Sequence, residues 1–269
     1  MLAHRRRASL KLAILAATVL AASLAIPAQT QDTFNDALTR GVTAFKAGHY
    51  TEAVAAFQKA LAVDPKSTRA LIDLGCAYAY QVVPNLDTPD NLALANKAID
   101  IFKQIPADDP EYHAALKQIA ALYRNTKRLD EARAAELAAL NLNPDDAETH
   151  YTIGVIDWME AYKFAVEALG SQGLTDDGVG NKRMTAATCA KIRSHNGSLV
   201  EDAITHLIRA VDLNPDYAMR YLNLAYRRKA DFDCAEPTAR TQDILAADKW
   251  IQRAVAVARA ASDAPFHSN

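Results

Sequence analysis

The chain has 269 residues, of which half are hydrophobic and only nine are glycine, so it can bury the core of one or two domains. Its formal net charge of −2 is too small to indicate a surface for nucleic acid or for an anionic membrane. Alanine-rich segments and few runs of β-branched residues favour an all-α fold.

The N-terminal residues 1–28 have the order of a secretory signal peptide. A basic stretch, His4–Arg7, precedes the apolar run Leu12–Ala25, and Pro27 closes that run. This order predicts cleavage after Ala25 or Ala28 and a periplasmic or secreted location. An uncleaved anchor is the alternative, but the run is shorter than the ~20 apolar residues of a membrane-spanning helix. We therefore expect no membrane span in the cleaved chain.

A helix-turn-helix unit follows between Arg40 and Pro65. Gly41 lies where two helices would approach closely, and Pro65 ends the unit because proline cannot continue a helix. The second helix carries an apolar stripe at helical spacing, made of Ala53, Phe57, Ala60 and Leu61. A small residue, an aromatic residue and a final proline at these offsets resemble the tetratricopeptide repeat, a 34-residue pair of helices.

The same register recurs along the chain. Each closing proline is followed ten positions later by a small helix residue, in the pairs Pro65 and Gly75, Pro110 and Ala120, Pro144 and Gly154, and Pro215 and Ala225. The third unit departs in one place, because Glu136 occupies the usual aromatic position. The resemblance implies an all-α, right-handed α-solenoid of about five repeats over residues 29–261. The repeats fall at about 34–67, 68–111, 112–145, 146–217 and 218–261, and a flexible tail, 262–269, is expected to follow.

Insertions lengthen three of these repeats. From the small residue to the closing proline there are 24 positions in repeats 1 and 3, but 35 in repeat 2 and 61 in repeat 4. The insertions, at about 80–90, 160–198 and 230–240, all fall between the first and the second helix of a repeat. Those turns share one edge of a stacked array, so we expect the insertions to form one rim.

In repeat 4 the helical spacing continues through the insertion, which predicts an elongated helical hairpin. Its first helix extends to Gly170, a residue that suits a helix end, and its second helix starts near Arg183. The loop at the tip contains Asp176 and Asp177. They lack the ligand spacing of a calcium loop, and we interpret them as a solvated turn.

In proteins of the family that this chain resembles, the first helices line a concave groove that binds an extended peptide. The corresponding positions here are Arg69, Tyr80, Lys117, Arg124, Asn125, Tyr151, Trp158, Leu222, Tyr226 and Lys229. Lys117 and Arg124 lie two helical turns apart and predict binding of an acidic or carboxylate-ended segment. The Lys and Asn set of the chaperone-binding members is incomplete, so chaperone tails are not expected. An ordinary solvated surface is the alternative for each of these residues.

The adjacent Asp157 and Trp158 permit two interpretations. They form either a groove pair that holds a ligand, or a buried aromatic anchor beside a carboxylate that is paired with Arg227 or Arg228 of the following helix. The second is favoured, because buried carboxylates are usually paired.

The three cysteines divide between the helices and the insertions. Cys76 lies within a helix and is expected to be a small buried residue. Cys189 and Cys234 lie in the insertions of repeats 4 and 5, on the same expected rim, where a disulfide bond would suit an oxidising compartment. Two separate thiols are the alternative.

Catalytic and metal-binding patterns are not evident in the sequence. The histidines are scattered without metal-ligand spacing, and there is no haem-attachment or nucleophile-elbow motif. We therefore predict a non-enzymatic protein-interaction scaffold of the cell envelope, without cofactor or metal. The alternatives are an accessory subunit of an envelope assembly that docks through the rim, and, less favoured, an enzyme with a site in the repeat 4 hairpin.

Overall fold

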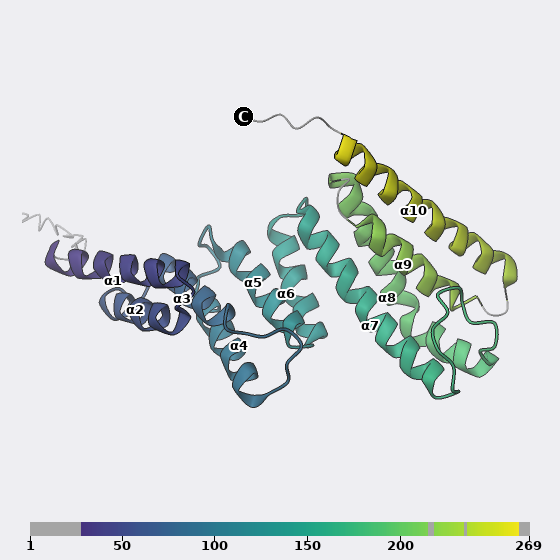
Figure 1. Ribbon diagram of the computed structural model, residues 1–269, viewed down its shortest axis with the longest axis horizontal. Helices are drawn as coiled ribbons and strands as arrows, with labels where there is room; N and C mark the ends of the chain where they lie inside the picture. Colours follow the sequence, from purple (N-terminus) through teal and green to yellow (C-terminus); the bar gives the residue numbers. More distant parts are fainter. Residues whose placement is uncertain (1–27, 215–217, 234–235, 264–269) are drawn as a thin grey trace, which may run out of the picture.

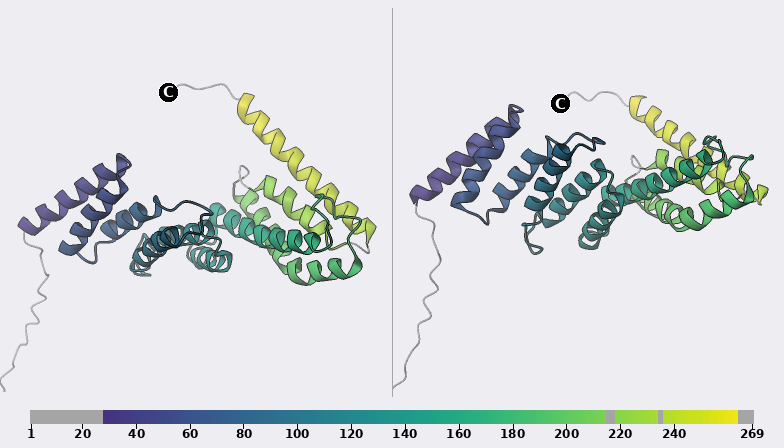
Figure 2. Two further views of the ribbon diagram at one scale, coloured as in Figure 1. Left: turned by 60° about the horizontal axis from the view of Figure 1, so that its bottom comes forward. Right: turned by 90° about the horizontal axis from the view of Figure 1, so that it is seen from below.

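The computed structural model describes residues 28–214, 218–233 and 236–263. Within those residues the secondary structure consists of ten helices, which form five consecutive helix pairs in an elongated solenoid (Figure 1). Figure 2 shows both ends of the solenoid turned toward the same side, so that the array is curved. The predicted all-α solenoid of about five repeats is confirmed.

The first helix of each pair is here named helix A and the second helix B. The pairs are α1 (Ala28–Lys46) with α2 (Tyr50–Val63), α3 (Thr68–Ala79) with α4 (Pro89–Phe102), α5 (Tyr112–Asn125) with α6 (Leu129–Leu142), α7 (Ala147–Gly170) with α8 (Ala186–Leu213), and α9 (Met219–Ala230) with α10 (Pro237–Asp263). Each helix packs on the next one in the chain, as in a solenoid.

Close approach within a pair depends on the small residue of helix A. Gly41 faces Phe57, Gly75 faces Phe102, and Gly154 faces Leu207. A Cβ atom added at any of these three glycines would lie within 2.7 Å of the facing side chain, so a larger residue has no room there. In repeat 3, Ala120 and Glu136 are separated by the same interval as Gly41 and Phe57 in repeat 1. A carboxyl group therefore takes the place of the large apolar side chain.

The fourth pair is the elongated hairpin that the sequence predicts. Helix α7 has 24 residues and α5 has 14, which makes α7 about 15 Å longer at 1.5 Å per residue. Its end at Gly170 agrees with the prediction. Helix α8 begins at Ala186, three residues later than expected, because the side chain of Thr185 accepts a hydrogen bond from the backbone N–H of Thr188 and caps the helix.

The tip of this hairpin, residues 171–185, is exposed at Thr175 and Asp177, as expected of a solvated turn, but it is also held against repeat 5. It lies beside the end of α9 (Figure 1). Arg227 donates a hydrogen bond to the carbonyl oxygen of Gly178 at 2.8 Å, and Arg228 donates to Asp176 at 2.6 Å. Gly180 has φ +79° and lies against the backbone of Ala230. The two basic residues at the end of α9 thus bind the tip to repeat 5.

The buried carboxylate of Asp157 has a different partner from the one expected. Arg133 of α6 donates to both of its oxygens, at 2.6 and 3.3 Å, whereas Arg227 and Arg228 contact the hairpin tip. The reason is packing order, because α6 lies against α7. Burial raises the pKa of Asp157 even though the Arg133 guanidinium opposes the shift.

The two ends of the chain extend beyond the described residues. The predicted signal peptide lies outside them except for Ala28, and so do residues 264–269 of the predicted tail. Residues 262–263 of the predicted tail belong to α10. Within the described ranges, no helix combines the length and apolar character needed to cross a bilayer.

Candidate functional site

A cleft of about 300 Å³ opens on the helix A face between repeats 3 and 4. Its walls come from α5 and α7, and α6 contributes Glu136. Lys117 and Arg124, the two cations predicted to act together, both line it, and Glu148 and Thr152 line the α7 side. We name this feature the Glu136 cleft.

Lys117 is already engaged by carboxylates of the next repeat. Its Nζ lies 3.0 Å from Asp146 and 2.5 Å from Glu148, and Nε2 of His113 lies 3.4 Å from the same Asp146. Burial lowers the pKa of Lys117, but the two carboxylates outweigh burial and the net shift is upward. The charge of Lys117 is therefore balanced inside the chain, where it helps to hold α5 against the start of α7.

Arg124 has no carboxylate at ion-pair distance among the described residues. It is half-buried at the end of α5, and its side chain makes no hydrogen bond with another described residue. Its guanidinium is close enough to Glu136 to stabilise the carboxylate form of that residue. Arg124 is thus a cation in the cleft that a ligand can reach.

Glu136 is 3 % exposed, and its Oε2 atom has no hydrogen-bond partner among the described residues. Burial raises the pKa of Glu136 to about 7, although the positive charges of Arg124 and Lys117 oppose this shift. Sequence reasoning identified Glu136 as a departure from the repeat but did not assign it to a site. The signal was present, because Glu136 follows Ala120 by the same interval that separates Phe57 from Gly41.

A cluster of aromatic side chains lies on α7, which forms one wall of the cleft, and on α9. Tyr151, Trp158 and Tyr162 lie on one stripe of α7, with Tyr221 of α9 beside them; we name these four the aromatic row. The Trp158 ring stacks on Tyr162 at 5.2 Å and meets Tyr221 edge-on at 5.3 Å. Tyr151 meets Tyr221 edge-on at 5.7 Å. Trp158 is half-buried, so it serves both as an anchor for the core and as part of the helix A face.

The other predicted groove residues do not join this site. Arg69 pairs with Asp73 at 2.7 Å. Tyr80 meets Phe45 edge-on at 5.0 Å near the other end of the solenoid. Lys229 pairs with Glu201 at 2.9 Å, Tyr226 packs on the core, and the carbonyl oxygen of Asn125 accepts a hydrogen bond from Asn85. Leu222 is fully buried, which excludes it from the groove.

Cys189 is buried on α8, with its sulfur 3.4 Å from the carbonyl oxygen of Phe232. Phe232 precedes Cys234 by two positions, but Cys234 lies outside the described residues, so the predicted bridge stays a prediction. Cys76 is a half-buried free cysteine, and burial, followed by the charge of Asp73, raises the pKa of its thiol.

Two histidines that are far apart in sequence meet inside repeat 4. The Nδ1 atoms of His150 and His206 lie 2.9 Å apart, and Nε2 of His150 lies 3.0 Å from the carbonyl oxygen of Pro144. Sequence spacing could not reveal this pair, because the long insertion separates its members. In the described part of the chain, no group of three or more His, Cys, Asp or Glu side chains is arranged to hold a metal ion.

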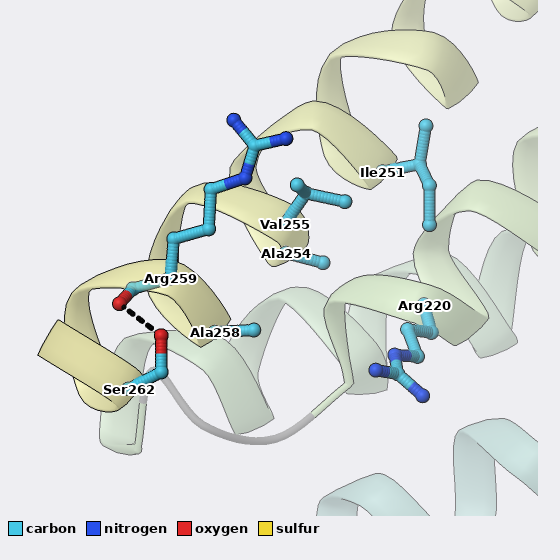
Figure 3. A pocket seen from close by; sticks show the side chains of 7 residues that line it. All are labelled: Arg220, Ile251, Ala254, Val255, Ala258, Arg259 and Ser262. Atoms are coloured by element: carbon cyan, nitrogen blue, oxygen red, sulfur yellow. Dashed lines mark hydrogen bonds between the residues drawn. The ribbon is translucent and has the colours of Figure 1, made fainter.

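A second, more open pocket of about 480 Å³ lies at the C-terminal end between α9 and α10. Figure 3 shows its lining, in which Ile251, Ala254, Val255 and Ala258 of α10 face the side of Arg220. The surface is mostly apolar and is carried by the last helix of the array.

Comparisons with known proteins agree with this architecture. A family model described as tetratricopeptide repeat matches residues 37–67, and no curated protein matches the sequence. Among solved structures, a crystal structure of MamA is 17 % identical with a TM-score of 0.54, over 88 % of this chain and 100 % of that chain.

Two further solved structures have a similar fold. MamA 41-end from Desulfovibrio magneticus RS-1 is 15 % identical with a TM-score of 0.54, over 89 % of this chain and 100 % of that chain. YrrB, described as a TPR protein with an unusual peptide-binding site, is 13 % identical with a TM-score of 0.51, over 87 % of this chain and 100 % of that chain. At such identities the likeness concerns the fold.

Proposed function

We propose that the chain, which matches the tetratricopeptide repeat over residues 37–67 and has the fold of such proteins, is a non-enzymatic scaffold that binds an extended peptide segment of a partner protein. The segment lies along the helix A face from α5 to α9. Solenoids of stacked helix pairs offer such extended surfaces, and YrrB, which has a similar fold, is described as having a peptide-binding site.

The observation that carries this proposal is the position of the aromatic row, because most of it lies on α7, the helix that also forms one wall of the Glu136 cleft. Glu148, on the wall of the cleft, is followed one helical turn later by Tyr151, where the row begins. Tyrosine and tryptophan bind peptide side chains with large, rigid surfaces. Polar groups in the cleft can then orient the same segment. Anchoring and orientation on one continuous face suit a peptide better than a small molecule.

The proposal modifies the expectation of an acidic ligand. Lys117 has two carboxylate partners inside the chain, so Arg124 is the cation of the predicted pair that a ligand would meet. The periplasmic or secreted location, and docking through the insertion rim as an accessory subunit, remain proposals drawn from the sequence alone.

The test is selection of random nonapeptides from a display library on the full chain, followed by affinity measurement on variants. We expect Trp158→Ala and Tyr162→Ala each to weaken the selected peptides at least tenfold, because they remove the apolar anchor. Leu142→Ala is the matched control, since this exposed leucine lies at the end of helix α6, away from the groove. Thermal unfolding checks that each variant is folded. Equal binding by wild type and both aromatic variants would overturn the proposal.

A further inference from the structure

The Glu136 cleft contains a buried carboxyl group, and the general role of a scaffold does not explain it. In repeats 1 and 2 the corresponding position is a phenylalanine that fills the space against a glycine. In repeat 3 the position holds a carboxyl group that is almost fully buried and lines the cleft. Burying a carboxyl without a hydrogen-bond partner is costly, so this residue weakens the packing of its own repeat.

The charges around the carboxyl restrict what could bind it. A ligand carboxylate would suit Arg124 but would add negative charge beside Glu136. A ligand ammonium group would suit Glu136 but would add positive charge beside Arg124. An apolar side chain would cover the buried carboxyl and leave it without a partner. A carboxylate, an ammonium group and an apolar side chain would therefore each leave at least one charged or polar group of the cleft in an unfavourable contact or without a partner.

A primary carboxamide avoids all three penalties. It is neutral, and one planar group carries both an NH₂ donor and a carbonyl acceptor. We infer that the Glu136 cleft binds the side chain of an asparagine or glutamine in the peptide, whose NH₂ donates to the Glu136 carboxyl and whose carbonyl oxygen accepts from Arg124. This inference rests on the proposed peptide-binding function and names the side chain that the groove selects.

The carboxamide suits either protonation state of Glu136. As a carboxylate the residue accepts from the amide N–H, and as a neutral acid it can also donate its O–H to the amide carbonyl. A lysine side chain could pair only with the carboxylate form. Binding of an amide side chain therefore depends less on the charge of this buried group than binding of a lysine does.

The test uses the nonapeptides selected on the full chain. We expect each strong binder to contain an asparagine or glutamine whose replacement by glutamate, lysine or norleucine weakens binding at least tenfold, because a site built for hydrogen bonding rejects analogues that lack the bond. On Glu136→Met the same replacements should weaken binding clearly less than on wild type, because only the hydrogen bond with Arg124 remains to be lost. Glu136→Gln, which keeps the shape but not the charge, should retain part of the preference and serves as the second variant.

The outcomes separate the two proposals. If the library yields no binder, the groove function is wrong and the amide assignment is wrong with it. If binders depend on Trp158 but not on an amide residue, or prefer glutamate or lysine at the sensitive position, only the amide assignment is overturned. The amide assignment alone is also overturned if the amide replacements weaken binding equally on wild type and Glu136→Met.

Discussion

The Nδ1 atoms of His150 and His206 lie 2.9 Å apart between the two long helices of repeat 4. Only one of them can donate to the other when both rings are neutral, and protonation of both would oppose two positive charges at contact distance. The pair therefore couples the packing of α7 against α8 to pH.

We expect the chain to lose stability through this pair in mild acid. Burial, followed by the charges of His150 and Arg133, lowers the pKa of His206 below its ordinary value of 6.5. The unfolded chain then binds the proton more readily than the folded chain. The contribution is fully present above pH 6.5 and is lost as the pH falls below it. Urea unfolding between pH 5 and 7.5 should show a weaker acid loss for His206→Gln, whereas exposed His49→Gln should behave like wild type. Equal acid loss in all three proteins would contradict this account.

Glu136 should have the opposite pH dependence. Its pKa is raised from 4.5 to about 7 in the folded chain, so its contribution is fully present below pH 4.5 and is lost as the pH rises through 7. Glu136→Met removes the buried carboxyl and should stabilise the protein by about 2 kcal/mol at pH 8. The gain should shrink toward pH 5, where wild-type Glu136 is neutral. Urea unfolding at the two pH values measures both quantities, and a destabilised variant at pH 8 would show that the carboxyl has partners that the structure lacks.

Two glycine substitutions in repeat 4 form a matched pair. Gly154→Ala places a Cβ atom 2.5 Å from Cγ of Leu207 and should destabilise the fold by about 2 kcal/mol through overpacking. Gly197→Ala, on α8, meets nothing within 4 Å and should stabilise it by roughly 0.5–1 kcal/mol through helix propensity. Thermal unfolding compares them. The double variant Gly154→Ala with Leu207→Ala should lose less stability than the sum of the two single losses, and a purely additive double variant would argue against direct contact.

The Arg133 and Asp157 pair should contribute far more than a surface pair. Arg133→Leu leaves the fully buried carboxylate of Asp157 without its guanidinium and should cost roughly 3 kcal/mol. Arg209→Leu removes an exposed pair with Asp145 and should cost less than about 1 kcal/mol. Chemical denaturation of the two variants gives the comparison. Similar losses in both would mean that Asp157 finds another partner or takes up a proton.

The repeat register could be determined from the sequence, because it rests on local rules. Three patterns depend on residues within one helix pair: the interval from Gly41 to Phe57, the closing prolines, and the helical spacing through Gly170. Each of these patterns predicted helices or turns that the structure contains. Helix periodicity is a property of neighbours along the chain. The same reasoning located Arg124 on the helix A face.

The tertiary structure decided which charged side chains are paired with one another. Lys117 is balanced by Asp146 and Glu148 of the following repeat, Asp157 is bound by Arg133 of the preceding helix, and the hairpin tip is held by Arg228 from repeat 5. Each of these partners comes from a different helix pair, and ion pairing depends on distance in space and on burial. Only the stacking of the helix pairs determines which cation a ligand can reach. The same stacking places Glu136 in the lining of a cleft.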